Sequence, residues 1–368
     1  MIKLGHITVR GFKSIRDLAR FEVRNLNVLI GANGAGKSNF LSLFKLLNWM
    51  GRTPGELQLH VGMEGGASSL LHDGPAMTPA IEVEMVLVGQ KVTYEHRFRL
   101  AHAAEDTLVF AEEQIRLQRL TSKKSEPWGS LGSGHRETRL LEAAENQNLV
   151  ARALHNQLRD LVVYQFHNTS QTARVRQRWN VDDNHALKED AANLAPILRR
   201  LREDEPHCYR QITETLRAIA PFFADFVLEP QNGTMLLQWR EVGSDVVFGP
   251  HQSSDGSLRA MALITLLLLP EGLLPSVIIL DEPELGLHPS AVEVVGGLIR
   301  NLSRHRQVII ATQSAAFVNQ FEPADIVVVE RKGRESVFTQ LDEEALREWL
   351  TDYSLAELWE KNVIGGTP

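Results

Sequence analysis

The fold of this chain is decided by one octapeptide, Gly31-Ala32-Asn33-Gly34-Ala35-Gly36-Lys37-Ser38. It fits the pattern G-x-x-x-x-G-K-[ST], although an ordinary glycine-rich turn can fit that pattern by chance. An apolar run over 26–30 precedes it and predicts a strand, while 39–47 has the apolar spacing of a helix. In that setting the loop presents backbone N–H groups and a helix N-terminus to an anion. We therefore predict a nucleotide site from Gly31 to Asn39, with Lys37 at the β- and γ-phosphates and Ser38 on Mg²⁺.

A second motif is an apolar strand pattern over 277–280 that ends in two carboxylates, Asp281 and Glu282. A fully buried strand of a parallel sheet has this pattern, and its C-terminal end opens onto the ligand crevice. Beside a phosphate-binding loop, Asp281 is expected to hold Mg²⁺ as a Walker B aspartate does, and Glu282 to act as general base on the attacking water. The alternative is a strand end that merely reaches solvent.

A third motif, over 252–259, is a serine–glycine turn directly ahead of a long apolar helix pattern at 258–269. A turn at a helix N-terminus can bind an anion, but Ser253, Ser254 or Asp255 could simply cap the helix. The position of the turn, about 25 residues before Asp281, favours the anion-binding interpretation.

The composition limits the classes to which the chain can belong. A hydrophobic content of 43% and a charged content of 23% are ordinary for a globular protein, and Cys208 is the only cysteine. The longest apolar run, 260–269, is too short to cross a bilayer, so we expect a cytoplasmic protein with no membrane partner. The net charge of −7 argues against a uniformly cationic nucleic-acid binder. Six arginines in the most basic stretch suit either a solvated, salt-bridged surface or a DNA or partner contact: Arg174, Arg176, Arg178, Arg199, Arg200 and Arg202.

Strand and helix patterns alternate near the loop, which predicts an α/β fold with a mostly parallel sheet between helices. The expected strands are 2–9, 21–23, 26–30, 81–88, 92–100, 108–117, 161–166, 226–228, 235–239, 277–280, 308–311 and 326–329. The expected helices are 39–47, 140–158, two within 187–219 with a break near Pro206, 258–269, 290–302 and 315–319. We expect a long irregular insertion over 51–79 and a mobile loop over 121–138.

The order of these motifs resembles the ABC-type ATPase heads of the SMC and RecF class, from the first strand to about Glu330. The resemblance implies a P-loop NTPase with an antiparallel β-subdomain, a small helical lobe and Mg²⁺-dependent hydrolysis of ATP. It assigns the stretch Gly11–Ser14, including Lys13, to the nucleotide site, 284–289 to the D-loop, and 312–314, including Gln313, to the catalytic switch. The turn of Ser254, Asp255 and Gly256 becomes the signature motif, which binds the γ-phosphate held by a second copy.

Three features depart from that family. Asp255 replaces a glycine and Ser257 replaces the usual glutamine. Gln313 stands where a switch histidine is common, and an amide cannot act as a cation. The Q-loop residue, a metal ligand in the family, is not obvious; Gln165 is the best candidate, or else an ordinary polar residue at a strand end.

The resemblance is narrower still over 164–170, 254–259 and 281–289. These stretches are similar to compact prokaryotic AAA-family ATPases related to the ATPase half of OLD proteins. The group implies an ATP-dependent homodimer in an anti-phage system, beside an effector such as a nuclease. Fewer than 40 residues follow Glu330, too few for a nuclease domain, so the effector is expected to be a separate chain. RecF-like DNA repair and a transporter ATP-binding subunit are the alternatives. Only about 85 residues separate 168 from 253, without sustained heptads, so we expect no long coiled coil.

We expect a single ATPase domain over 1–368. Its parts would be an N-terminal lobe (1–120), a helical lobe with insertions (121–250), a lobe with signature, Walker B, D-loop and switch (251–335), and a helical tail (336–368).

Overall fold

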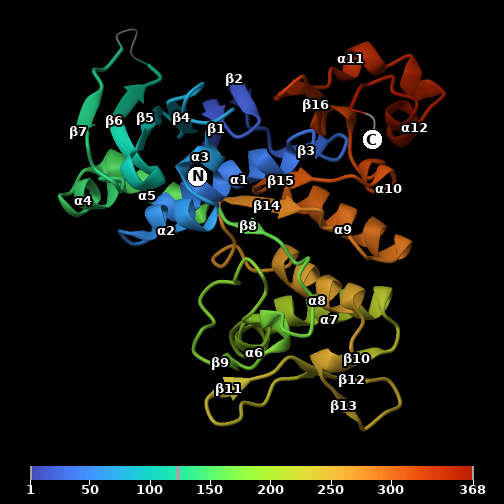
Figure 1. The fold of residues 1–368 in the computed structure, drawn as a ribbon. Coiled ribbons are helices and arrows are strands. Elements are labelled where there is room, and N and C mark those ends of the chain that lie inside the picture. Colours follow the sequence, from blue (N-terminus) through green and yellow to red (C-terminus); the bar gives the residue numbers. More distant parts are fainter. Residues whose placement is uncertain (1, 122–124, 367–368) are drawn as a thin grey trace.

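The structure, a computed structural model, describes residues 2–121 and 125–366 (Figure 1). Its centre is a six-stranded sheet in the order β17-β16-β3-β15-β14-β8. The strands are β3 (Leu26–Ile30), β8 (Val163–Tyr164), β14 (Val277–Asp281), β15 (Gln307–Ala311), β16 (Ile326–Lys332) and β17 (Glu335–Gln340). All pair in parallel except β17 with β16. The mostly parallel sheet is thus confirmed.

The three strands β3, β14 and β15 are buried at every residue, which explains their mostly apolar sequences. Successive side chains of β14 enter opposite cores: Ile278 packs with one hydrophobic cluster and Ile279 with the other. Helix α1 (Lys37–Met50) lies in the Ile279 cluster, and α8 (Asp255–Leu267) and α9 (Pro289–Leu302) lie in the Ile278 cluster. The sheet therefore has helices on both faces.

A second six-stranded sheet is antiparallel, in the order β2-β1-β4-β5-β6-β7. Its strands are β1 (Lys3–Phe12), β2 (Ile15–Glu22), β4 (Ala80–Val88), β5 (Val92–Ala103), β6 (Thr107–Arg119) and β7 (Gly129–Gly132). The strands expected over 81–88 and 92–100 are confirmed as β4 and β5, which pair antiparallel. Apolar residues of one face share a core with α1, so this sheet is fixed beside the phosphate-binding loop.

A lower body in Figure 1 contains α8 together with α6, α7 and small sheets. Its other elements are α6 (Leu194–Asp204), α7 (Pro206–Ile219), β9 (Trp179–Asn180), β10 (Phe223–Val227), β11 (Thr234–Met235), β12 (Gln238–Glu241) and β13 (Val247–Phe248). The predicted break between the two helices is confirmed, and Pro206 is the first residue of α7, where its missing N–H costs nothing.

Five sequence expectations were wrong. The strand expected over 235–239 is two strands, β11 and β12, and the helical tail expected over 336–368 begins within strand β17. The stretch 51–79 is not irregular throughout, because α2 (Glu56–Met63) and α3 (Ala67–Leu70) bury Leu57, Val61 and Leu70. The single helix expected over 140–158 is two helices, α4 (Leu140–Glu145) and α5 (Leu149–Asp160), because Asn148 accepts hydrogen bonds from the N–H groups of Val150 and Ala151 and so caps a new helix. The strand expected over 161–166 is only the two residues of β8.

The remaining segments are short. The expected loop over 121–138 contains β7, and its residues 122–124 lie outside the described residues. Helix α10 (Ala315–Val318) follows β15, and α11 (Glu343–Leu346) and α12 (Leu355–Glu360) lie near the C-terminal end. Single 3₁₀ turns cover Ala104–Asp106, Arg174–Arg176, Pro250–Gln252, Pro323–Asp325 and Trp349–Thr351. Within the described residues, no helix is both long enough and apolar enough to cross a membrane.

Candidate nucleotide site

The predicted phosphate-binding loop lies between the end of β3 and the start of α1. Gly36 has a φ of +115°, and a Cβ at this position would lie 1.9 Å from Ser336 Oγ on β17. Only glycine fits there, because the loop is packed directly against the β16–β17 hairpin. The loop is therefore held in place from outside as well as by its own chain.

Lys37 is the buried cation of this loop, with 5% of its surface exposed. Its Nζ donates hydrogen bonds to the carbonyl oxygens of Gly31 (2.5 Å) and Ala32 (3.0 Å). Burial lowers the pKa of Lys37, although the nearby carboxylates Glu282 and Asp281 act in the opposite direction. The structure thus brings the Lys37 ammonium near the two carboxylates that follow the apolar strand.

The side chains of Asn39 and Lys13 have protein partners. Asn39 Nδ2 donates to Ser14 Oγ (2.7 Å), and Ser336 Oγ also donates to Ser14 Oγ (2.7 Å). Lys13 has a φ of +47° and its Nζ binds Glu64 Oε2 at 2.7 Å, on the residue that ends α2. Both predicted nucleotide-binding side chains therefore lie beside the loop or its neighbouring turn and are held there by hydrogen bonds.

Asp281 ends β14 and is 8% exposed. Its Oδ2 accepts a hydrogen bond from Gln165 Nε2 (2.5 Å), and Gln165 Oε1 accepts one from Lys45 Nζ (2.6 Å). Sequence reasoning missed Lys45, which lies two turns after Lys37 on α1. Burial is the main cause of the lowered pKa of Lys45. The amide nitrogen of Gln165 faces Asp281, so an oxygen ligand for a metal would require this amide to rotate.

Glu282 and Gln313 meet at the ends of two neighbouring strands. Asp281 pairs with Ala311 across β14 and β15, and the residues that follow lie side by side. Gln313 Nε2 donates a hydrogen bond to Glu282 Oε1. Glu282 has a φ of +43°, a left-handed conformation that is strained for this residue and common at functional sites.

A second buried carboxyl, Glu284, was missed as a site residue. Thr312 Oγ1 donates a hydrogen bond to Glu284 Oε1, while Glu284 Oε2 is buried and has no hydrogen-bond partner among the described residues. Burial raises the pKa of Glu284 to about 7. The pair links the segment after β14 to the segment after β15, on which Gln313 lies.

The serine–glycine turn begins α8. Ser254 Oγ accepts a hydrogen bond from the N–H of Ser257 (3.2 Å), so the simple capping role exists in the structure. A Cβ at Gly256 would lie 2.4 Å from the carbonyl oxygen of Gly286, so the turn packs closely on the segment expected to be the D-loop. Among the described residues, no hydrogen bond joins this turn to the loop Gly31–Ser38.

Two arginines that sequence reasoning did not place in the site hold this region together. Arg259 on α8 donates hydrogen bonds to the carbonyl oxygens of His167 (2.9 Å) and Leu285 (3.1 Å). Arg176 is 6% exposed and binds Asp255 Oδ1 at 2.8 Å. The interpretation of the basic stretch as a solvated surface is therefore wrong for Arg176, because its guanidinium is buried.

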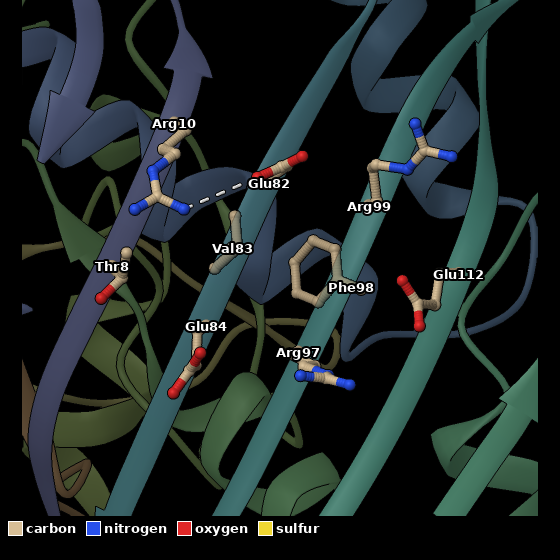
Figure 2. A pocket seen from close by; sticks show the side chains of 9 residues that line it. All are labelled: Thr8, Arg10, Glu82, Val83, Glu84, Arg97, Phe98, Arg99 and Glu112. Atoms are coloured by element: carbon tan, nitrogen blue, oxygen red, sulfur yellow. Dashed lines mark ion pairs between the residues drawn. The ribbon is translucent and has the colours of Figure 1, made fainter. Parts of the chain in front are cut away.

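A hollow of about 280 Å³ lies elsewhere, on the outer face of the antiparallel sheet (Figure 2). Opposite charges alternate across its strands, with Arg10, Glu82, Arg99 and Glu112 at successive positions in register. Such cross-strand pairs stabilise an exposed sheet face without a ligand. None of the loop residues 31–38 lines this hollow, so it is not the nucleotide site.

The donors at the loop fit Mg²⁺. Ser38 is exposed on α1, and Asp281 ends β14 of the same sheet, so a hydroxyl and a carboxylate oxygen are available. Mg²⁺ prefers such oxygen ligands and commonly takes only one or two from the protein, with substrate phosphates and water supplying the rest. Within the described part of the chain, no group of three or more His, Cys, Asp or Glu side chains could hold a metal ion alone.

Comparison with known proteins agrees with this geometry. Residues 26–319 match the family described as "AAA domain, putative AbiEii toxin, Type IV TA system". The chain is also similar to the energy-coupling factor transporter ATP-binding protein EcfA2 of Acetivibrio thermocellus, with 25% identity over 152 residues. That match covers 41% of this chain and 46% of EcfA2, so the chain spans less than half of that relative.

Two solved structures are similar over most of their length. One is an SMC head bound to the C-winged helix domain of ScpA, with a TM-score of 0.62, 17% identity, and coverage of 94% of this chain and 99% of that one. The other is the Pyrococcus furiosus Smc head with an extended coiled coil, bound to the C-terminal domain of ScpA, with a TM-score of 0.60, 15% identity, and coverage of 96% and 99%. This similarity confirms the ABC-type head fold predicted from the motif order.

Proposed function

The chain belongs to this family of AAA domains and is an ATPase of the AAA/ABC type, and from this premise we propose that it is an ATP-driven switch. Two copies would bind ATP, close head to head, and separate after hydrolysis. The closed and open states would control a separate effector protein in an anti-phage defence system.

The observation that carries the proposal is the separation of the two half-sites in one chain. Lys37, Asp281 and Glu282 gather at the loop, but the turn at Ser254 has no hydrogen bond to that loop among the described residues. Ser254 is exposed at the N-terminus of a 13-residue helix, where backbone N–H groups favour an anion. A second copy would bring this turn to the γ-phosphate.

The chemistry follows from the residues around the loop. The loop amides and Lys37 would bind the phosphates, and Ser38, Asp281 and, after amide rotation, Gln165 would hold Mg²⁺, which neutralises charge on the phosphates. Glu282 would accept the proton of the water that attacks the γ-phosphorus, and ADP would leave with the bridging oxygen. Gln313, already bonded to Glu282, would orient that water.

The first test removes the proposed base. Glu282→Gln should lower ATP turnover by about a hundredfold or more and lengthen the life of an ATP-bound dimer, measured by light scattering. Glu293→Gln, at an exposed position of α9, is the matched control and should turn over ATP like the wild type. Unchanged turnover in Glu282→Gln would remove Glu282 from the base role.

The second test addresses the signature half. Ser254→Arg, added to Glu282→Gln, should abolish the ATP-dependent dimer while each chain still binds ATP. A dimer that persists in this double variant would show that the Ser254 turn does not contact the nucleotide of a second copy.

The defence role is supported by the family description, which names a putative toxin of a Type IV toxin–antitoxin system. DNA repair has less support, because arginines of the basic stretch face carboxylates of the same chain: Arg174–Asp190, Arg176–Asp255, Arg199–Glu203, Arg200–Asp204 and Arg202–Glu229. ATP-dependent DNA binding with a steep salt dependence would reverse this preference. Co-purification with a membrane protein would favour the transporter alternative, for which EcfA2 is the precedent.

A further inference from the structure

Asp255 is an unexpected residue for a turn that would receive a phosphate. It lies between Ser254 and Gly256, and its side chain is 60% exposed. A carboxylate here would repel the γ-phosphate of a second copy. A capping role does not require Asp255, because the cap is provided by Ser254 Oγ.

Arg176 approaches Asp255 from the protein interior. Its side chain is 7% exposed and its Nη2 lies 2.8 Å from Asp255 Oδ1. Nε donates to the carbonyl oxygen of Thr169 (2.8 Å), and Nη1 donates to the carbonyl oxygen of Pro250. The guanidinium is thus oriented by two backbone groups, and its remaining nitrogen points at the turn.

From this geometry we propose that Arg176 is a positioning residue for the composite ATP site, which neutralises Asp255 and holds its carboxylate away from the incoming γ-phosphate. The inference rests on the proposed function, because the phosphate belongs to the ATP bound by the second copy. Arg176 does not contact the ATP itself and acts through Asp255. A merely structural Arg176 would instead tie the 3₁₀ turn Arg174–Arg176 to the turn Pro250–Gln252, whatever residue stands at 255.

The two roles differ in their response to removal of the Asp255 charge. ATP turnover per chain is measured as a function of protein concentration, and ATP binding is measured on dilute chains. Arg176→Met should lower turnover about tenfold and require more protein for half-maximal turnover, with ATP binding by the single chain unchanged, because one nearby opposite charge is lost. Asp255→Gly serves as the background for the double variant, and in that background Arg176→Met should lower turnover by less than about threefold.

Two further variants complete the design. Arg174→Met is the matched control, two residues before Arg176. It removes an exposed arginine that is paired with Asp190, and it should change neither turnover nor ATP binding. Arg176→Lys keeps the charge but not the planar fork, so it should retain most of the turnover if charge is what matters. It also keeps the test informative if Arg176→Met does not fold.

Each adverse outcome is distinct. A double variant as impaired as Arg176→Met, or Arg176→Lys as impaired as Arg176→Met, would overturn the inference and leave a structural role. Wild-type turnover in Arg176→Met would overturn it as well. Failure of the proposed function would already be visible in measurements on the wild type. Its turnover per chain would not depend on protein concentration, and it would form no ATP-dependent dimer.

Discussion

The two halves of the proposed composite site are held in very different ways. The loop half is anchored in the interior: Lys37 is 5% exposed, and Gly36 is packed against Ser336 of a nearby strand. The signature half lies at the surface, where Ser254 and Asp255 are exposed and Arg176 provides the link to the interior. One half is preorganised within a single chain, whereas the other would meet a phosphate only in a second copy.

This difference has a consequence for the order of events. A preorganised loop loses little conformational freedom when it binds phosphates, so a single chain is expected to bind ATP before any contact with another. The N–H groups of the exposed turn at Ser254 would bind a phosphate only when two copies close on each other. The switch would therefore be set by closure rather than by nucleotide binding.

The largest expected effect is on ATP affinity, when one residue of each half is substituted in turn. Lys37→Ala should weaken ATP binding by a dilute single chain about a hundredfold, because a charge-assisted hydrogen bond to phosphate is lost. Ser254→Arg should leave that affinity within about threefold of the wild type and still abolish turnover. Titration of dilute protein with a fluorescent ATP analogue measures both. Equal loss of affinity in the two variants would break the comparison, since both halves would then act in one chain.

A second prediction concerns Glu284, which follows β14 and accepts a hydrogen bond from Thr312, directly after β15. Burial raises the pKa of Glu284 from 4.5 to about 7 in the folded state. Between these two pH values the folded protein therefore keeps a proton that the unfolded chain has lost. Stability conferred by the neutral carboxyl is complete below pH 4.5 and declines as the pH rises to 7, by up to about 3 kcal/mol. Glu284→Gln cannot titrate, so its stability relative to the wild type should increase from pH 5 to pH 8.

Urea unfolding at the two pH values measures this change, with Glu293→Gln as the exposed control. A stability difference between Glu284→Gln and the wild type that is the same at both pH values would mean that Glu284 is already ionised at pH 5. The loop half would then be joined to the switch segment by a charged contact rather than by a neutral one.

The sequence was informative wherever the signal is local. The buried strands β3 and β14 are mostly apolar because both of their faces are covered, and the loop between β3 and α1 is a contiguous motif. The insertion was misjudged because its glycines and histidines obscured the helical spacing of Leu57 and Val61.

Contacts between distant segments could not be predicted from one sequence. Gln165 meets Asp281 across 116 positions, and Lys45 meets Gln165 across 120. Arg176 reaches Asp255 across 79 positions, and nothing in the alternating arginines separates it from its exposed neighbour Arg174. Residue types and spacing identify the loop half of the site, but the support of the signature half depends on tertiary packing.

The smallest expected effect tests whether a third region belongs in the comparison. Arg10, on the hollowed outer face of the antiparallel sheet, lies 3.0 Å from Asp17 and 3.8 Å from Glu82, and all three side chains are more than half exposed (Figure 2). Exposed ion pairs of this kind contribute little, so Arg10→Ala should change the free energy of unfolding by less than about 1 kcal/mol and leave ATP turnover unchanged. Chemical denaturation and a turnover assay on the same preparation decide the matter. A clear loss of turnover at normal stability would mean that this sheet face contributes to closure, and that a description in terms of loop and signature halves omits one surface.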